Sequence, residues 1–193
     1  MLHYVTTNPG KLREARQYLG DETITDYDYD YPEIQHDSLE PIAAAGARDA
    51  YREVGAPVVV DDSGLFLDAF DGFPGPYSAY VEDTLGVETV WDLARTVENR
   101  DAAFRCVMAY CDGGAVDEPA GPGRVVDGKL PVRVFVGEVG GEIVAPRGDG
   151  GFGYDPIFEH VGSTFAERSS AEKNDLSHRG RALAAFAEWY DHR

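Results

Sequence analysis

Two hydrophobic patterns alternate along the chain. Short apolar runs bounded by turn residues predict β-strands, and longer segments with apolar residues every three or four positions predict α-helices. The predicted strands are residues 2–6, 22–27, 57–60, 65–69, 102–110, 133–139, 142–145 and 155–158. The predicted helices are residues 9–19 and 42–54, helical segments up to about residue 97, and a terminal helix that begins at His178. Helices alternate with strands early and hairpins dominate later, so the pattern predicts an α/β fold with a mixed sheet.

Residues that favour helix ends and turns separate these segments. Asn8 is a typical N-cap, Pro9 suits the first helical position, and Gly20 follows the predicted 9–19 helix. Residues 61–64, Asp-Asp-Ser-Gly, lie between two apolar runs and favour a turn that joins two strands.

The size and composition of the chain indicate one domain over residues 1–193. With 43% hydrophobic residues, a chain of this length can bury a sizeable core. The N-terminus lacks a basic region and a long apolar stretch, so we expect no signal peptide and no membrane span. Cys106 and Cys111 are too few for a zinc cage or a disulfide framework, and we expect both to be buried in a protein of the reducing cytoplasm.

The net charge of −18 is spread along the chain and is not confined to a tail. A dedicated nucleic-acid-binding protein needs a basic face for phosphate contacts, so the charge argues against that class. An acidic surface with few lysines is typical of proteins that stay hydrated in concentrated salt, and we interpret the charge as halophilic adaptation. The alternative is an acidic surface for a partner.

Two of the three lysines lie in short polar motifs. Lys11 ends the sequence Thr6-Thr7-Asn8-Pro9-Gly10-Lys11, which leads from a predicted strand into a helix. A helix N-terminus with free N–H groups and a nearby lysine suits phosphate. The alternative for these residues is an ordinary helix cap.

Asp61 and Asp62 interrupt two apolar runs. Carboxylates at the edge of a core are costly unless they are solvated, hydrogen-bonded or bound to a metal. Because strand side chains alternate, one of the two could hold Mg²⁺ or a water while the other caps backbone. The alternative is simple turn chemistry.

Two further clusters contain candidate binding residues. In residues 150–158, glycines flank Phe152 and expose a ring suited to stacking on a base, and Asp155 could bond a base edge. The alternative is a glycine-rich hairpin. Ser177-His178-Arg179 begins the last predicted helix, whose positive end would face a ligand.

Together these motifs resemble the inosine triphosphate pyrophosphatase family in order and spacing. The resemblance rests on residues 6–11, 58–64, 151–158 and 172–179, and it extends to residues 31–35 and 72–78. It implies two lobes flanking a long mixed sheet with the nucleotide in a cleft between them, a homodimer, and Mg²⁺-dependent hydrolysis of ITP, dITP or XTP to the monophosphate and pyrophosphate.

The resemblance also implies roles for individual residues. Glu33 and Asp62 would bind the metal, and Asp62 would also be the catalytic base for the attacking water. The residues that would contact substrate are Thr6, Thr7, Asn8, Pro9, Gly10, Lys11, Ser63, Phe152, Gly153, Tyr154, Asp155, Lys173, His178 and Arg179.

Two features depart from the family pattern. Relatives commonly carry a substrate-contacting lysine in the helix after Glu33, whereas residues 42–50 have none; either Arg48 compensates or the contact is absent. The Gly- and Pro-rich segment 113–130 is longer than usual and predicts an inserted hairpin or loop. Two rival hypotheses are a Maf-like pyrophosphatase with another base preference and a nucleotide-binding regulator without turnover.

Overall fold

The computed structural model describes residues 1–21, 23–114, 122–126 and 128–192. The strands are β1 (Leu2–Val5), β2 (Ile24–Tyr27), β3 (Val58–Leu67), β4 (Pro74–Gly75), β5 (Asp101–Cys111), β6 (Arg124–Val126), β7 (Val132–Ile143), β8 (Phe158–His160) and β9 (Ser163–Thr164). The α-helices are α1 (Pro9–Leu19), α2 (Leu39–Val54), α3 (Ser78–Leu85), α4 (Val87–Ala94), α5 (Ser170–Leu176) and α6 (His178–Asp191), and short 3₁₀ turns cover Asp68–Phe70, Asp155–Ile157 and Phe165–Glu167.

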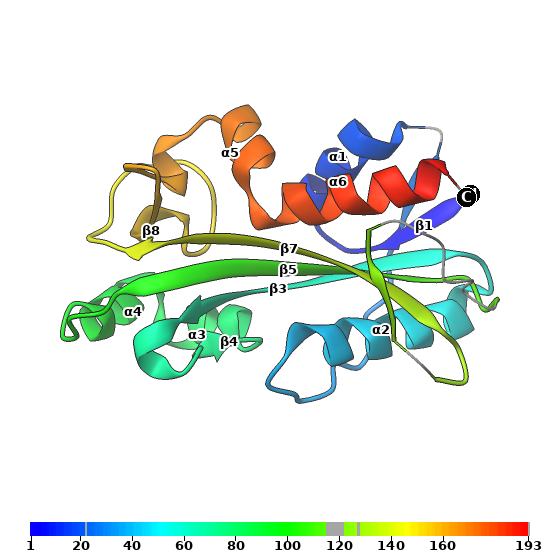
Figure 1. Ribbon diagram of the computed structural model, residues 1–193, viewed down its shortest axis with the longest axis horizontal. Coiled ribbons are helices and arrows are strands. Elements are labelled where there is room, and N and C mark those ends of the chain that lie inside the picture. Colours follow the sequence, from blue (N-terminus) through cyan, green and yellow to red (C-terminus); the bar gives the residue numbers. More distant parts are fainter. Residues whose placement is uncertain (22, 115–121, 127, 193) are drawn as a thin grey trace. The chain divides into compact units, whose positions relative to one another are not determined.

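The predicted α/β class and mixed sheet are confirmed. Hydrogen-bonded neighbours follow the order β2-β1-β3-β5-β7-β8-β9, with β4 beside β3 and β6 beside β7 (Figure 1). The pairs of β1 with β2 and with β3 are parallel, whereas the described pairs that involve β4, β6, β8 and β9 are antiparallel.

Several predicted boundaries were wrong. Residues 61–64 do not form a turn, because they lie inside the continuous strand β3. The predicted strands 133–139 and 142–145 are one strand, β7. Residues 155–157 form a 3₁₀ turn before β8, where a strand was expected. The helix α5 was not predicted.

The chain divides into two compact units, and it passes between them within β3, β5, β7 and α6. Unit 1 comprises Met1–Asp62, Cys106–Gly137 and Gly180–Arg193, and unit 2 comprises Ser63–Arg105 and Glu138–Arg179. The prediction of a single domain over residues 1–193 stays a prediction.

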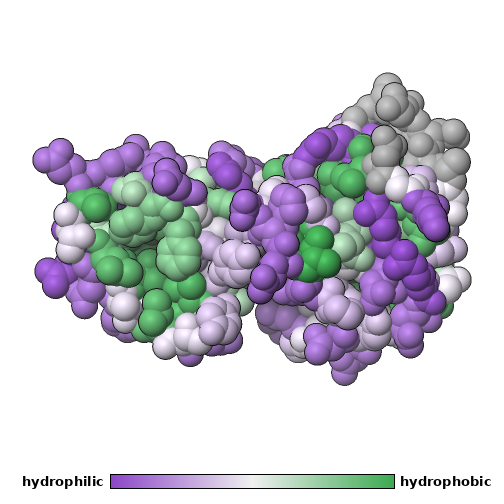
Figure 2. Space-filling view, turned by 90° about the horizontal axis from the view of Figure 1, so that it is seen from below, coloured by the Kyte–Doolittle hydropathy of each residue, from purple (hydrophilic) through white to green (hydrophobic). Residues whose placement is uncertain are grey.

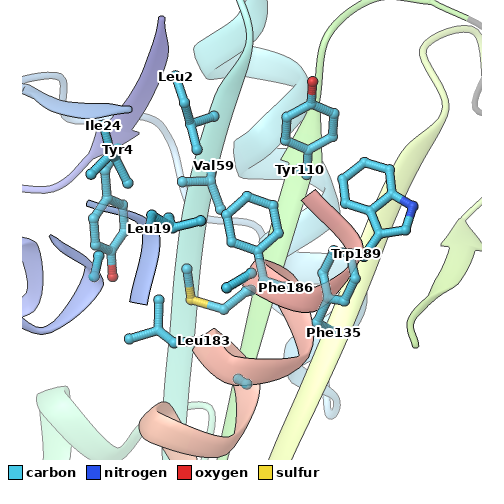
Figure 3. Packing of buried hydrophobic residues seen from close by; sticks show 14 of the residues in the cluster. Leu2, Tyr4, Leu19, Ile24, Val59, Tyr110, Phe135, Leu183, Phe186 and Trp189 are labelled. Atoms are coloured by element: carbon cyan, nitrogen blue, oxygen red, sulfur yellow. The ribbon is translucent and has the colours of Figure 1, made fainter. Parts of the chain in front are cut away.

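Unit 1 has its core between its strands and the helices α1 and α6. In Figure 1, α2 covers the opposite face of these strands. Leu12, Ala15 and Leu19 share one face of α1 and are buried, as expected for apolar residues three or four positions apart. Leu183 and Phe186 of α6 are fully buried in the same cluster. Figure 3 shows Phe186 beside Tyr110, Phe135 and Trp189, and burial of each such side chain contributes about 1.5–3 kcal/mol.

Unit 2 has a second core of buried side chains. Phe104, Phe158 and Phe165 pack ring against ring, with centroids 4.6–5.9 Å apart. In Figure 1, α3 and α4 lie on one face of this unit's strands and α5 on the other. The loop before β8 and the start of α6 carry most of the candidate site residues of this unit.

Three expectations about the whole chain can be compared with the structure. Cys106 and Cys111 are free and buried, as predicted. Within the described ranges, none of the helices has the length and hydrophobicity that crossing a membrane requires. The hairpin expected in segment 113–130 is present in part, because β6 pairs antiparallel with β7; residues 115–121 and 127 lie outside the described part of the chain.

Candidate functional site

The turn before α1 is an ordinary helix cap and also the edge of a cavity. Asn8 Oδ1 accepts hydrogen bonds from the backbone N–H groups of Gly10 and Lys11, at 2.8 and 3.4 Å. Thr6 Oγ1 accepts from the N–H of Asn8 at 3.1 Å, and Pro9 stands at the first helical position. This cap fixes the backbone at the start of the helix that carries Lys11.

Lys11 reaches a carboxylate fifty residues away. Its Nζ lies 3.0 Å from Oδ1 of Asp61 in β3, and the hydroxyl of Tyr4 in β1 donates to the same oxygen at 2.8 Å. Asp61 is 7% exposed, and these two partners stabilise the buried carboxylate. The pairing of β1 with β3 brings Tyr4 and Asp61 together.

A cavity of about 450 Å³ opens beside this ion pair. Its lining consists of Val5, Thr6, Thr7, Lys11, Tyr29, Asp30, Tyr31, Glu33 and Asp61, all in unit 1. Among these described lining residues there are three carboxylates, and the cation is Lys11. The cavity therefore offers hydroxyl and ammonium donors together with hard oxygen ligands.

The structure assigns different surroundings to the two neighbouring aspartates. One of the two was expected to hold Mg²⁺ or a water while the other caps backbone, and the family resemblance placed Asp62 at the site. Asp61 in fact lines the cavity and holds Lys11. Asp62 is half-buried and is not among the described residues that line the cavity. Both lie close enough to Tyr31 to act on its charge state.

Glu33 is exposed and lies in the irregular segment before α2. It lines the cavity with Asp61, and it acts electrostatically on Tyr31 together with Asp61, Asp62 and Asp30. Burial is the main cause that raises the pKa of Tyr31, and these carboxylates raise it further. Tyr29 also has a raised pKa, chiefly because its hydroxyl bonds to Asp49.

The donor set of this cavity fits Mg²⁺. Over the described ranges, no group of three or more His, Cys, Asp and Glu side chains forms a ready-made metal cage. Mg²⁺ is usually bound by one or two carboxylates together with substrate phosphates and waters, and it does not need such a cage. Glu33 and the aspartates near Tyr31 supply oxygen ligands of that kind.

In unit 2, the loop before β8 presents an aromatic ring. Phe152 is 55% exposed, and its N–H donates to Oδ2 of Asp155 at 2.8 Å. Gly151 has a φ of 73°, and an added Cβ would lie 2.1 Å from the same oxygen, so the tight turn requires glycine. Next to Gly153 in this loop, the buried Tyr154 donates to the carbonyl of Ser78 at 2.8 Å.

Lys173 of α5 joins this loop from the side. Its ammonium forms an ion pair with Asp155, and both side chains are buried. The same Nζ lies 4.1 Å from the centroid of the Phe152 ring, which places a cation over the aromatic face. Asp155 was predicted to bond a base edge; its Oδ2 is already engaged by Lys173 and by the N–H of Phe152.

The start of α6 supplies the last predicted residues. His178 and Arg179 are 7% and 5% exposed. The His178 ring stacks on Phe104 with centroids 4.7 Å apart, and Cζ of Arg179 lies 5.9 Å from the Phe152 centroid. Phe152, Lys173 and Arg179 therefore form one cluster. The remaining predicted residue, Ser63, is half-buried in β3 at the start of unit 2.

The sequence analysis missed four residues that line the cavity of unit 1: Val5, Tyr29, Asp30 and Tyr31. The signal in the sequence that could have pointed to the tyrosines and Asp30 is the motif at residues 31–35, which contains Glu33. Arg48 was considered as a replacement for a missing lysine. Its guanidinium donates to the carbonyls of Leu130 and Val126, at 2.8 and 2.9 Å, so it holds the segment after β6.

The profile of the Ham1 family matches residues 2–189 of the chain. The chain belongs to the Ham1 family. It is similar to the dITP/XTP pyrophosphatase of Methanopyrus kandleri, with 50% identity over 97% of this chain and 94% of that protein. It is also 47% identical to the dITP/XTP pyrophosphatase of Methanosarcina mazei, over 97% of this chain and 95% of that protein. The resemblance to inosine triphosphate pyrophosphatases is thereby confirmed.

Solved structures of Ham1 proteins have the same fold. The Ham1 protein of Staphylococcus aureus is 26% identical, covers 100% of this chain and 99% of its own, and has a TM-score of 0.81. The HAM1 protein of Coxiella burnetii has the same TM-score at 30% identity, with full coverage of both chains.

Proposed function

We propose that this Ham1 protein hydrolyses non-standard purine nucleoside triphosphates, ITP, dITP and XTP, to the monophosphate and pyrophosphate. The observation that carries this proposal is the similarity, over nearly the full chain, to proteins named dITP/XTP pyrophosphatase. The reaction would remove such nucleotides from the cellular pool. The cavity of unit 1 and the aromatic cluster of unit 2 support it, because each suits one end of a nucleotide.

The triphosphate would bind in the cavity of unit 1. Lys11, Thr6 and Thr7 line it and offer an ammonium and two hydroxyls to phosphate oxygens. Asn8, Pro9 and Gly10 would act through the backbone turn that aims Lys11. The pairing of Lys11 with Asp61 fixes the position of the ammonium before substrate arrives.

Mg²⁺ would be held by Glu33 and Asp62 and would neutralise phosphate charge when bound. Asp62 would also accept the proton of the attacking water as a general base. The water oxygen forms the new bond to phosphorus, the anhydride bond between the α- and β-phosphates breaks, and the pyrophosphate leaves. The proximity of both Asp62 and Glu33 to Tyr31, which lines the cavity, supports this role.

The base would be selected near Phe152 in unit 2. The exposed ring suits stacking, and Gly153, Tyr154, Asp155 and Lys173 would border or support the base pocket. Ser63 would contact substrate beside the metal-binding residues. His178 and Arg179 would donate hydrogen bonds to the 6-oxo group of hypoxanthine or xanthine. Adenine carries a 6-amino donor there, and a site built for one group rejects the other by up to about 10⁴–10⁵-fold.

A cytoplasmic homodimer is part of the proposal. Figure 2 shows hydrophobic residues gathered over the face of unit 2 that carries α3 and α4. Tyr80, Leu85 and Leu93 in these helices are 71%, 50% and 46% exposed. Large exposed apolar areas are typical of interfaces, and a second copy of the chain would cover this one. No membrane or nucleic-acid partner is proposed.

The test is a panel of nucleotides with separate detection of pyrophosphate and orthophosphate. We expect ITP, dITP and XTP to release pyrophosphate with Mg²⁺, ATP to be a very poor substrate, and EDTA to stop turnover. Release of orthophosphate with a diphosphate product would contradict the reaction. A preference for other bases would favour a Maf-like enzyme, and binding without turnover would favour a regulator.

A further inference from the structure

The cavity of unit 1 has a shortage of positive charge for its proposed ligand. Its described lining includes the carboxylates Asp30, Glu33 and Asp61, and the ammonium of Lys11 is already paired with Asp61. The triphosphate is itself highly anionic. Mg²⁺ would offset part of this charge, and neutral donors are needed for the remaining phosphate oxygens.

One side chain in this lining is held in place by its fit to α2. The ring of Tyr31 lies directly against Gly46, and a Cβ added there would lie 2.4 Å from Cε2 of the ring. Real Cβ atoms do not approach so closely, so the ring occupies space that only glycine leaves open. The Tyr31 ring therefore has a defined position on one wall of the cavity.

The hydroxyl of Tyr31 is uncommitted in comparison with the two tyrosines nearby. Tyr4 donates to Asp61, and Tyr29 donates to Asp49, each at 2.8 Å. Within the part of the chain that the structure describes, the hydroxyl of Tyr31 forms no hydrogen bond. A tyrosine hydroxyl is protonated at neutral pH and can donate a hydrogen bond.

We propose that the Tyr31 hydroxyl contacts the substrate, donating a hydrogen bond to an oxygen of the terminal phosphates that leave as pyrophosphate. The inference rests on the proposed function for its substrate. Lys11 and Tyr31 line the same cavity, and the terminal phosphates carry the highest charge density of the nucleotide, so they would be bound where the ammonium lies. Tyr31 thus supplies a hydrogen-bond donor without adding a charge. Gly46 of α2 leaves the space that the Tyr31 ring occupies.

Tyr31→Phe tests the contact, because it removes one hydroxyl and keeps the ring against Gly46. We expect kcat/KM for dITP to fall by about 10- to 100-fold, as for the loss of a hydrogen bond to a charged group. The melting temperature of the free protein should not fall, since the hydroxyl has no partner among the described residues. An unchanged kcat/KM, or a loss of activity that matches a loss of thermal stability, would overturn the inference.

Tyr29→Phe is the matched control. It also removes a tyrosine hydroxyl from the cavity lining, but that hydroxyl already donates to Asp49. The control should lower the melting temperature and should reduce kcat/KM much less than Tyr31→Phe does. An equal kinetic loss in both variants would mean that the cavity responds to any lost hydroxyl, and the specific contact of Tyr31 would be rejected.

Gly46→Ala provides a second route to the same result. The added methyl group must displace the Tyr31 ring, so this variant should show the same kinetic defect while retaining the hydroxyl. The double variant with Tyr31→Phe should be little worse than either single variant, because both act on one contact. Additive losses would contradict a shared cause.

Binding of pyrophosphate separates this inference from the proposed function. Calorimetry with Mg²⁺ and pyrophosphate needs no turnover, and Tyr31→Phe should weaken binding by a factor similar to its loss in kcat/KM. If the wild type does not release pyrophosphate from dITP or XTP, the proposed function fails, and the calorimetric comparison still tests Tyr31. Equal affinity of the two proteins for pyrophosphate would overturn the contact.

Discussion

Asp61 and Asp62 show how two identical side chains acquire different roles. Asp61 accepts bonds from Lys11 and Tyr4 and is buried, so it neutralises and aims the lysine. Asp62 lies one residue further along β3 and does not line the cavity, but it is close enough to Tyr31 of the lining to act on its charge state. The first holds the cavity wall together, and the second is left for the metal and the water in the proposed reaction.

Substitution of each aspartate should separate these roles. Asp62→Asn should lower kcat for dITP by about 10²–10⁴-fold, the usual contribution of a general base, with little change in melting temperature. Asp61→Asn should lower the free energy of unfolding by about 1.5–3 kcal/mol, because the charged partner of Lys11 is lost. Steady-state kinetics and thermal unfolding of both variants give the comparison. Similar kinetic losses with unchanged stability in both would contradict the division.

The candidate residues that could be predicted from sequence are those whose role is local. The cap formed by Asn8 and Pro9 follows from neighbouring residues, and the exposure of Phe152 follows from its flanking glycines. The bond between Lys11 and Asp61 spans fifty residues, and the contact of Tyr31 with Gly46 depends on how an irregular segment packs on α2. Local pattern carries no information about such contacts.

At the scale of elements, α5 is a short helix whose start is stabilised by charge. Ser169 accepts from the N–H of Glu172, and the Glu172 carboxylate accepts from the hydroxyl and the N–H of Ser169. This capping box compensates for the short length of a seven-residue helix that carries Lys173. The bond from the Ser169 hydroxyl is the main cause that lowers the pKa of Glu172.

The lowered pKa predicts how this helix responds to acid. The folded state favours the charged form of Glu172, so its contribution is present above the unfolded pKa of about 4.3 and is lost as pH falls through the folded value. Glu172→Gln should therefore lower the melting temperature at pH 7, and the difference from the wild type should shrink towards pH 4. Glu188→Gln, on the exposed face of α6, is the control. A difference that does not vary with pH would contradict the prediction.

The elements themselves were predicted where end signals are strong. The bounds of α1 agree with Asn8 and Gly20, and the start of α6 at His178 was confirmed. Residues 61–64 have turn-forming side chains, yet tertiary pairing keeps them extended in β3. The helix α5 is short, and the sequence feature that marks its start is a capping box. A search for apolar periodicity does not detect such a box.

The whole molecule is strongly acidic. Its net charge of −18 arises from 35 acidic and 17 basic residues, and three of the latter are lysines. Several exposed arginines are paired with acidic side chains, including Arg95 with Asp92 and Arg105 with Glu138. Such exposed pairs contribute little each, so the excess negative charge is not neutralised by them.

This excess charge predicts that stability depends on salt. At 0.01 M salt the Debye length is about 30 Å, so like charges repel across the folded protein, whereas at 1 M it is about 3 Å. The folded state holds these charges closer together than the unfolded chain, and screening therefore favours folding. We expect the melting temperature to rise steadily with KCl from low to molar concentration. Sucrose at matched osmolality is the control, because it does not screen charge; a melting temperature that stays flat in KCl would remove the halophilic interpretation.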